Sequence, residues 1–279
     1  MSQSGTVNAY NKLTLYTHKT TKSKNFNSMK IGIIGAGQIG GTLIRQYAKA
    51  GHEVKMTNAS GIEKLEDLAT ETGAKAVSLT DVVKDVDVVV ISIPLIAITK
   101  LPKDLFKHAS PNAVIVDTSN YYPARDGKIQ DIENGMVESV WISNQIQRPI
   151  IKAYNNILSG SLVYSGLPKG DPGRLALPIA GDNKQSKDLV ATLINDSGFD
   201  CLDAGMLEDS WKQQPGSPPY CTDLNLAQLK RSIAKTKREL LPKRRELGLG
   251  YILLHDPKEW KVWWKDFANH FRIIYESEL

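Results

Sequence analysis

The feature that most constrains this chain is a short glycine-rich segment, Gly35-Ala36-Gly37-Gln38-Ile39-Gly40, placed between an apolar run and a helical one. The run before it, residues 30–34, is dominated by β-branched isoleucine, and residues 42–50 after it have helical character and end at Gly51. Strand, tight turn and helix in this order are the context in which a glycine loop of this spacing binds phosphate groups.

Glycine is needed at each of the three positions for a different physical reason. Gly35 makes the tight turn, and Gly37 lets the backbone approach a pyrophosphate because it has no Cβ. Gly40 lets the helix pack closely on the strand, so that the positive helix N-terminus stabilises the phosphate charge. We therefore predict that residues 35–40 bind the pyrophosphate of a dinucleotide cofactor.

Further apolar runs alternate with helical segments along the chain. Fully apolar runs are typical of parallel strands that are covered on both faces. The pattern predicts an α/β fold, a Rossmann-type, doubly wound, mostly parallel sheet over residues 29–223. Strands are expected over 30–34, 52–56, 74–77, 87–93, 113–117, 149–154, 175–180 and 198–204, and helices over 42–50, 62–72 and 183–195, with a helical turn opened by Thr80.

The last part of the chain, residues 224–279, predicts a helical C-terminal extension. It combines a charged helix over 224–241 with an aromatic stretch in which Trp263, Phe267 and Phe271 share one face at helical spacing. We expect this face to pack on the body of the protein or on a second subunit in a homodimer. A helix that lies on a membrane surface or binds another partner is the alternative.

Residues 1–28 carry four lysines and no acidic residue, and they lack the apolar run of a secretory signal. We interpret them as a disordered leader, or as the result of a start codon placed upstream of Met29. Because these lysines account for most of the formal charge of +5, the folded body is nearly neutral and has no continuous basic stripe. Nucleic acid is therefore not an expected partner.

The two cysteines, Cys201 and Cys221, lie far apart with no ligand at metal-binding spacing, so we expect neither a disulfide framework nor a metal site. The longest apolar stretch, residues 86–98, is interrupted by Asp87 and is shorter than the roughly 20 residues that span a membrane. These features predict a cytoplasmic protein without a membrane segment.

The end of the second expected strand distinguishes the two nicotinamide cofactors, because NAD needs a carboxylate about 20 residues after the glycine loop. Residues 56–61 contain no acid, whereas Thr57, Asn58 and Ser60 are small donors suited to a 2′-phosphate, together with Ala59 in the same turn. Lys55 or Lys64 could add a positive charge. The segment therefore favours NADP(H) over NAD(H).

Several longer motifs accompany the glycine loop and cover about two thirds of the chain: residues 34–41, 58–65, 92–94, 117–120, 152–155 and 209–216. In these motifs the chain resembles the predicted dinucleotide-binding enzymes related to deazaflavin (coenzyme F-420)-dependent NADP oxidoreductases. More distantly it is similar to pyrroline-carboxylate reductases and to the cytosolic domains of membrane metalloreductases.

The resemblance implies that NADP(H) lies along the carboxyl edge of the sheet, with Ile93 and Pro94 against the ribose and the backbone of Ala153 facing the carboxamide. Relatives commonly carry Ser-Arg where this chain has Ala59-Ser60. The usual cation for the 2′-phosphate is therefore missing, and we expect only a modest preference for NADP(H).

Hydride transfer between cofactors depends on proximity and orientation more than on a strong general acid. The five histidines all fall outside the expected carboxyl-edge loops. Lys152 is the one ionisable candidate for catalysis, with Asn120 and Asn155 either orienting the reactants or serving as structural hydrogen-bonding groups, and with Trp211 in a loop that bounds the acceptor.

We expect an NADP(H)-dependent oxidoreductase whose acceptor is a flavin, a deazaflavin or a small organic molecule. A non-catalytic NADP(H) sensor and an imine or carbonyl reductase are the alternatives.

Overall fold

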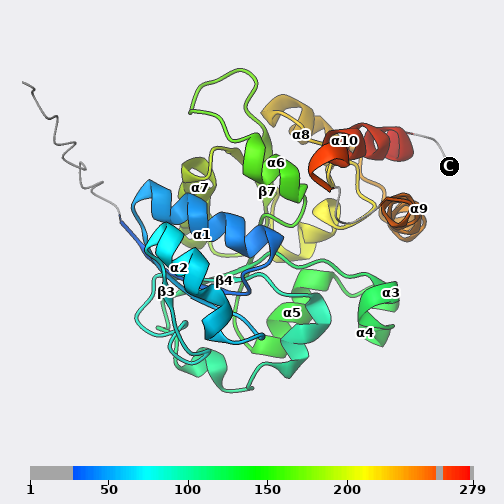
Figure 1. The fold of residues 1–279 in the computed structure, drawn as a ribbon. Helices are drawn as coiled ribbons and strands as arrows, with labels where there is room; N and C mark the ends of the chain where they lie inside the picture. The colour runs from blue at the N-terminus through cyan, green and yellow to red at the C-terminus, as the bar shows by residue number, and fades with distance from the viewer. Residues whose placement is uncertain (1–27, 256–259, 277–279) are drawn as a thin grey trace, which may run out of the picture.

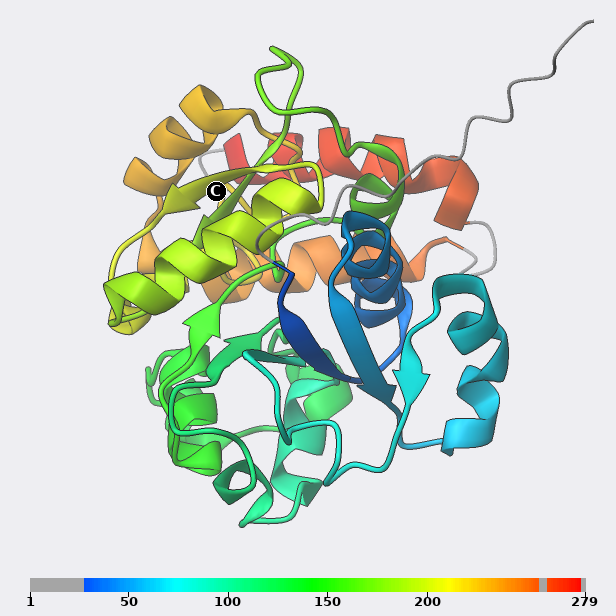
Figure 2. The same ribbon diagram turned by 90° about the vertical axis from the view of Figure 1, so that its left-hand side faces the viewer.

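A computed structural model describes residues 28–255 and 260–276, so the leader expected over residues 1–28 lies outside the described residues except for Ser28. Six parallel strands form a sheet in the order β3-β2-β1-β4-β5-β6, which is the doubly wound arrangement (Figures 1 and 2). The Rossmann-type fold expected from the sequence is confirmed. The strands are β1 (Lys30–Ile34), β2 (Glu53–Thr57), β3 (Lys75–Ala76), β4 (Val88–Ile91), β5 (Val114–Asp117) and β6 (Ile151–Lys152).

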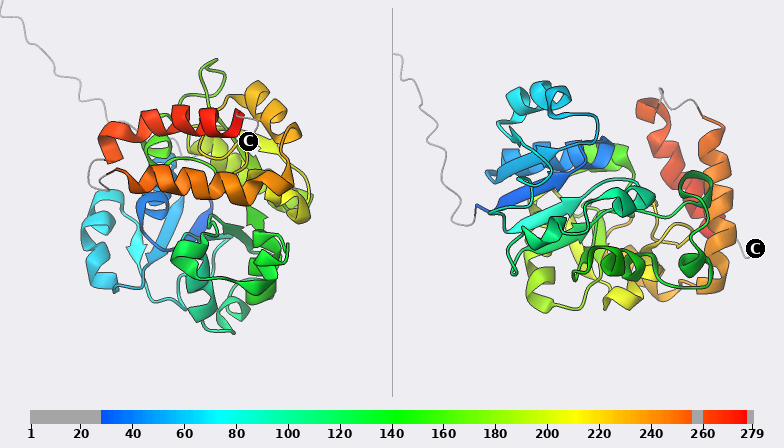
Figure 3. Two further views of the ribbon diagram at one scale, coloured as in Figure 1. Left: turned by 90° about the vertical axis from the view of Figure 1, so that its right-hand side faces the viewer. Right: turned by 90° about the horizontal axis from the view of Figure 1, so that it is seen from below.

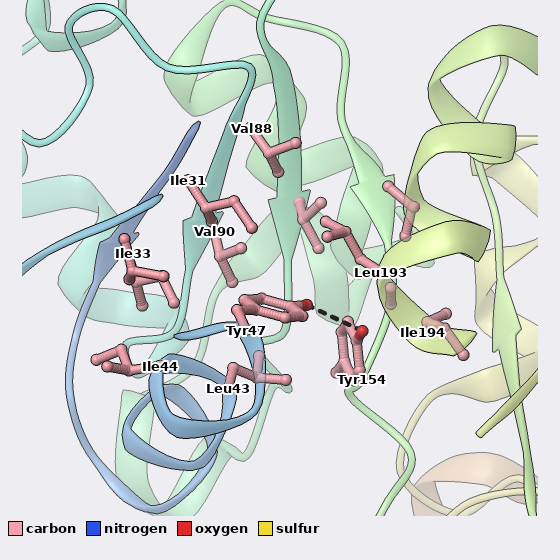
Figure 4. Packing of buried hydrophobic residues seen from close by; sticks show 14 of the residues in the cluster. Ile31, Ile33, Leu43, Ile44, Tyr47, Val88, Val90, Tyr154, Leu193 and Ile194 are labelled. Carbon is pink, nitrogen blue, oxygen red and sulfur yellow. Dashed lines mark hydrogen bonds between the residues drawn. The ribbon is translucent and has the colours of Figure 1, made fainter. Parts of the chain in front are cut away.

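One face of the sheet is covered by α1 (Gln38–Ala50), α6 (Ser159–Tyr164) and α7 (Lys184–Asp196), whose apolar side chains pack on β1 and β4. Tyr47 of α1 and Tyr154 after β6 face one another inside this layer, with their hydroxyl oxygens 2.9 Å apart (Figure 4). The fully apolar burial of β4 shows why its sequence lacks a polar alternation.

The opposite face is covered by α5 (Glu138–Ile146) and by the 3-10 helices η2 (Leu95–Lys100) and η3 (Leu105–Lys107). Two short helices, α3 (Pro123–Asp126) and α4 (Gln130–Glu133), lead from β5 to α5. The helix expected over 62–72 divides into η1 (Ile62–Leu65) and α2 (Glu66–Thr72), and the turn before β4 is capped by the Ser78 hydroxyl, not by Thr80 as expected.

A second, two-stranded parallel sheet pairs β7 (Ala176–Ile179) with β8 (Asp200–Asp203). An antiparallel bridge between Lys152 and Ala180 joins it to the end of β6. The 3-10 helix η4 (Leu207–Gln213) follows and contains Trp211, in a segment that returns the chain toward the carboxyl edge of the main sheet.

The C-terminal extension differs from the expected single helix over 224–241. It forms α8 (Leu226–Ala234), the 3-10 turn η5 (Arg238–Leu240) and α9 (Leu241–Leu253), followed by α10 (Trp260–Glu276). Asn225 caps α8 through its side chain, and a proline in the first turn of α9 suits a new helix start at the point where the prediction ended.

Helices α9 and α10 lie on the side of the molecule toward which the carboxyl ends of the strands point (Figure 3). In α10 the aromatic face packs inward, because Trp264, Phe267 and Phe271 are all buried. The expected packing of this stretch on the body is therefore confirmed for Phe267 and Phe271, while the side chain of Trp263 lies outside the described residues. Among the described helices, none combines the length and the apolar character that a membrane crossing requires.

Candidate functional site

The surroundings of the three glycines in the loop agree with the roles predicted for them. Gly35 adopts φ +99°, and a Cβ there would stand 2.2 Å from the carbonyl oxygen of Ser92. A Cβ on Gly40 would stand 1.9 Å from the Gly35 carbonyl oxygen. A Cβ on Gly37, in contrast, would meet nothing within 4 Å, so this glycine faces open space.

The N-terminus of α1 is open in the same place. Gly37 is its N-cap, and no side chain accepts a hydrogen bond from the first turn, which also holds no acidic residue. Backbone N–H groups at an uncapped helix N-terminus suit an anion. Together with the open space at Gly37, this fits the pyrophosphate of a dinucleotide cofactor. Gln38 and Ile39, the first two residues of α1, would contact it.

The expected adenosine pocket lies beside this loop. The Thr57 carbonyl at the end of β2 accepts from the Gly35 N–H at 2.9 Å. Asn58 has a buried Oδ1 atom without a hydrogen-bond partner among the described residues, an acceptor that a ribose hydroxyl would satisfy. Ala59, Ser60 and Lys64 are exposed in the adjoining turn, free to approach a ligand.

Two charged side chains near this pocket, Lys55 and Glu63, have surroundings that the sequence did not predict. Lys55, one of the two candidate cations for the 2′-phosphate, donates its ammonium to the carbonyl of Lys84 at 2.8 Å and is therefore already engaged within the protein. Glu63, which the interpretation missed, folds its carboxylate over Gly61, with oxygens 2.5 and 2.7 Å from where a Cβ would stand. The signal in the sequence was Gly61. Its φ of +102° lets the chain turn back, and this turn brings Glu63 close to it.

The strand ends gather the other expected cofactor residues. Ile93 follows β4 and lies against Gly35, and Pro94 is the N-cap of η2. Ala153 follows β6 directly and is fully buried. Because β1, β4, β5 and β6 are neighbours in the sheet, these residues and the glycine loop share one carboxyl edge.

Asn120 and Asn155 meet in a closed network of amides. Asn120 donates to the backbone carbonyl of Asn155 at 2.8 Å, and the Asn155 amide donates to Asn120 Oδ1 at 3.0 Å. Gln213 completes the network, since its Nε2 donates to Asn155 Oδ1 at 2.9 Å and its backbone carbonyl accepts from the Asn155 amide at 2.7 Å. Sequence reasoning missed Gln213, although it stands in the motif that includes Trp211.

Lys152 has a different environment from the one a proton donor needs. Its Nζ lies 2.6 Å from Asp117 Oδ2 and also donates to the Ser119 carbonyl, and both charged side chains are fully buried. Asp117 accepts two further hydrogen bonds from Ser119. These contacts suit a structural role at the ends of β5 and β6, the alternative that the sequence left open for the neighbouring asparagines.

Two phenols adjoin the amide network. The hydroxyls of Tyr122 and Tyr220 lie 2.8 Å apart, and Asn120 Nδ2 lies 3.4 Å from Tyr220 Oη. Burial raises the pKa of both tyrosines well above the ordinary value, so both remain protonated at neutral pH. The strand-end site thus has neutral hydrogen-bond donors, although it has no exposed general acid among them.

Glu138 at the start of α5 is the acidic group beside this site. It is buried, accepts from the Tyr121 N–H at 3.1 Å, and has its pKa raised to about 7, chiefly because burial disfavours the charged form. Lys152 and Arg245 oppose that shift by stabilising the carboxylate. Glu138 therefore changes charge near neutral pH.

Trp211 lies at the outer side of the site, half-buried in η4. Lys212 and Arg238 each stand over its ring, with the charged atom or group 5.7 Å from the ring centroid. Two of the histidines that the structure describes lie away from this site. His52 bridges Met29 and Asp196 near the amino edge, and His270 stacks on Tyr251 within the C-terminal helices.

Two larger cavities, of about 390 and 410 Å³, lie at the amino ends of the strands and not at this edge. The first is bordered by Arg148 and the start of α7, and the second by His52 and Lys75. Ligands of open α/β sheets bind at the carboxyl ends, so the strand-end site described above is the candidate functional site.

Comparison with known proteins finds a family match for the part of the chain that holds the glycine loop. Residues 30–121 match the model of the family described as NADP oxidoreductase, coenzyme F420-dependent. Protein YjhV of Escherichia coli (strain K12) is 40% identical over 75 residues, a match that spans 27% of this chain and 55% of that protein. The chain thus spans about half the length of this curated relative.

Solved structures share the fold over a larger part of the chain. The hypothetical protein SMa0349 from Sinorhizobium meliloti is 27% identical, with a TM-score of 0.60, and the match covers 71% of this chain and 96% of that one. A "putative F420-dependent NADP-reductase" from Arthrobacter sp. FB24 is 20% identical, with a TM-score of 0.54, over 66% of this chain and 87% of that one.

An imine reductase variant from Myxococcus stipitatus, in complex with NAD⁺, has the same fold at 15% identity and a TM-score of 0.51, over 81% of this chain and 64% of that one. The resemblance seen in the sequence is confirmed for the part of the chain that holds the glycine loop. Over residues 30–121 the chain is similar to the coenzyme F420-dependent NADP oxidoreductase family.

Proposed function

We propose that this protein is an NADP(H)-dependent oxidoreductase that transfers hydride between the nicotinamide and an acceptor held at the carboxyl edge of the sheet. The acceptor is a deazaflavin, a flavin or a small organic molecule. Residues 29–223 act as the cofactor-binding domain and residues 224–279 as a helical extension. The observation that carries the proposal is the open space at Gly37 directly before the uncapped N-terminus of α1.

The cofactor supplies the hydride, and the side chains of the protein hold the reactants in the right orientation. Asn120 and Asn155 are fixed by reciprocal amide hydrogen bonds, so their orientation is set before any ligand binds. Gln213 locks this pair from the η4 segment and acts as a positioning residue. Preorganised dipoles of this kind lower the cost of orienting an acceptor.

Two measurements test the function. Calorimetric titration with NADPH should show binding, and stopped-flow absorbance at the nicotinamide band should show oxidation by at least one member of a panel of deazaflavin, flavin, carbonyl and imine acceptors. Asn155→Ala should reduce turnover at least tenfold with cofactor affinity almost unchanged, because it removes orientation and not binding. An exposed control, Lys184→Gln on α7, should alter neither quantity.

Binding without turnover of any acceptor would favour the non-catalytic sensor instead. In that case, NADPH should change the assembly state or protease sensitivity of the C-terminal helices. Absence of NADP(H) and NAD(H) binding would overturn the proposal.

Imine or carbonyl reduction is the second candidate, favoured by the paired phenols of Tyr122 and Tyr220. A neutral phenol can donate a hydrogen bond to a carbonyl oxygen or an imine nitrogen as negative charge develops there. Tyr220→Phe should then slow reduction of carbonyl or imine acceptors about 100-fold, while leaving flavin reduction much less affected. Equal effects on both acceptor classes would remove the support for this candidate.

A further inference from the structure

The C-terminal extension is anchored on the carboxyl-edge site at several points. Gly216 has φ +90°, and a Cβ there would stand 2.2 Å from the Leu241 carbonyl and 2.9 Å from the Arg245 nitrogen, so the loop and α9 are in close backbone contact. Arg272 of α10 donates to the carbonyls of Thr222 and Asp223 at 2.7 and 2.8 Å. Helix α9 is therefore fixed in place beside the site.

This contact brings two guanidinium groups over two aromatic rings next to the strand-end site. Arg245 of α9 stands 5.4 Å from the ring centroid of Tyr121, which directly follows the strand-end residue Asn120. Arg238 of η5 stands 5.7 Å from the ring centroid of Trp211 and donates to the Gly135 carbonyl at 2.5 Å. Both cations come from the extension, whereas both rings come from the Rossmann body.

These positive charges are incompletely balanced. Arg238 forms no ion pair with any residue that the structure describes. Arg245, whose side chain is largely buried, pairs with Glu246 at 3.0 Å, and only the Glu246 end of that pair is half exposed to water, which weakens it. The nearby Lys212 is paired with Asp209, and buried Glu138 is only partly ionised at neutral pH because its pKa is about 7.

The loop on which α9 packs also contains hydrogen-bonding groups without partners. Gln214 has a buried amide nitrogen and Ser217 a buried hydroxyl, and neither forms a hydrogen bond within the described chain. The two flank Gly216 at short range, and Gln214 is nine-tenths buried. Buried polar groups are nearly always satisfied in native proteins, so donors left in this state point to a polar ligand or to ordered water.

We infer that the C-terminal extension forms an anion subsite of the acceptor site, in which Arg238 and Arg245 recognise a carboxylate or phosphate group carried by the acceptor. This inference rests on the proposed function, because it assigns the subsite to the acceptor. Guanidinium groups on aromatic rings are pre-oriented and present charge-assisted donors to such a group.

The 2′-phosphate of NADP(H) is the other anion to consider, and position argues against it. The adenosine pocket lies at the end of β2, whereas Tyr121 follows β5, and β1 and β4 separate these two strands. Three strand spacings of about 4.8 Å put the two places roughly 14 Å apart. The 2′-phosphate of the cofactor and the two arginines of the extension therefore lie at different places along the carboxyl edge of the sheet.

Riboflavin and flavin mononucleotide provide a matched pair of probes, because they share the ring system and differ by one phosphate. Binding to the full chain is measured by flavin fluorescence anisotropy, which needs no turnover. Wild type should bind the mononucleotide about tenfold more tightly than riboflavin at low salt, the scale of one charge-assisted hydrogen bond. Added salt should reduce that difference.

Arg238→Gln and Arg245→Gln should each weaken binding of the mononucleotide about fivefold or more, while changing riboflavin affinity less than about twofold. Arg245→Lys should retain part of the preference, because it keeps the charge. Lys184→Gln, an exposed cation on α7, is the matched control and should leave both affinities unchanged. Thermal unfolding of each variant establishes that it is folded.

Several results would overturn the inference: wild type that binds neither flavin or shows no preference, variants that lose both flavins equally, or variants that lose NADPH but not NADH. The last result would assign the cations to the cofactor. A phosphate preference that depends on both arginines, without hydride transfer to any acceptor, would keep the subsite and contradict the proposed function.

Discussion

The ammonium group of Lys152 lies 2.6 Å from the Oδ2 atom of Asp117, and both side chains are fully buried at the ends of neighbouring strands. Removing one partner leaves an uncompensated buried charge, which typically costs about 3–5 kcal/mol. Lys152→Met should therefore lower the free energy of unfolding by that amount, as measured by urea denaturation. A stable Lys152→Met variant with a changed pH profile of turnover would instead indicate an acid/base role.

The glycine loop offers a matched pair of substitutions. Gly37→Val should weaken cofactor binding at least tenfold, about 1.4 kcal/mol, and leave the melting temperature unchanged, because its Cβ meets nothing within 4 Å. Gly40→Ala should lower the melting temperature, because its Cβ would meet the Gly35 carbonyl at 1.9 Å. Calorimetric titration and thermal unfolding of both variants provide the comparison. If Gly37→Val binds the cofactor normally, the pyrophosphate lies elsewhere.

Cofactor choice should depend on residues 60 and 63. Wild type is expected to prefer NADP(H) over NAD(H) by only about tenfold. Ser60→Arg should raise this ratio by adding a bidentate donor for the 2′-phosphate. Glu63→Gln should also raise it, because the carboxylate over Gly61 would repel that phosphate.

Titration of each variant with both cofactors measures the ratio, and Glu66→Gln, at the first residue of α2, is the control. An unchanged ratio in both variants would show that the turn after β2 does not border the adenosine ribose.

Glu138 should make stability depend on pH. Its folded pKa of about 7 is above the ordinary value of 4.5, so the folded protein binds more protons than the unfolded chain between these two values. Stability should therefore fall as pH rises from about 4.5 to 7, and this group should add no further change above that range, with a contribution on the order of 3 kcal/mol. Glu138→Gln should flatten this part of the profile.

Urea denaturation at pH 5 and pH 8 of wild type and Glu138→Gln gives the difference attributable to this carboxyl. If the difference between the two proteins is independent of pH, Glu138 is charged throughout the range.

Much of the fold and part of the candidate site could be predicted from the sequence, because those features depend on local chemistry. The roles of Gly35 and Gly40 follow from the absence of a side chain, and the strands follow from apolar runs that need cover on both faces. Asn120 and Asn155 could be placed at one edge of the sheet because parallel strands end together.

Contacts between distant segments were decided only by the tertiary structure. The sequence cannot show that Lys152 is committed to Asp117, that Lys55 turns to the Lys84 carbonyl, or that Gln213 locks Asn155. Each pairing depends on which strand ends and loops become neighbours, and the cost of burying a polar group then selects the partner.

The placement of α9 is the clearest case. The sequence predicts a helical extension over residues 224–279 but neither the bounds nor the docking site of this helix, because cations such as Arg245 suit a solvated face equally well. Its position follows from a glycine of positive φ at residue 216, which admits the helix backbone, and from the aromatic ring of Tyr121, which receives the guanidinium. The sequence by itself determined the Rossmann body and its glycine loop, whereas only the packing of the extension on that body decided which charges lie over Tyr121 and Trp211.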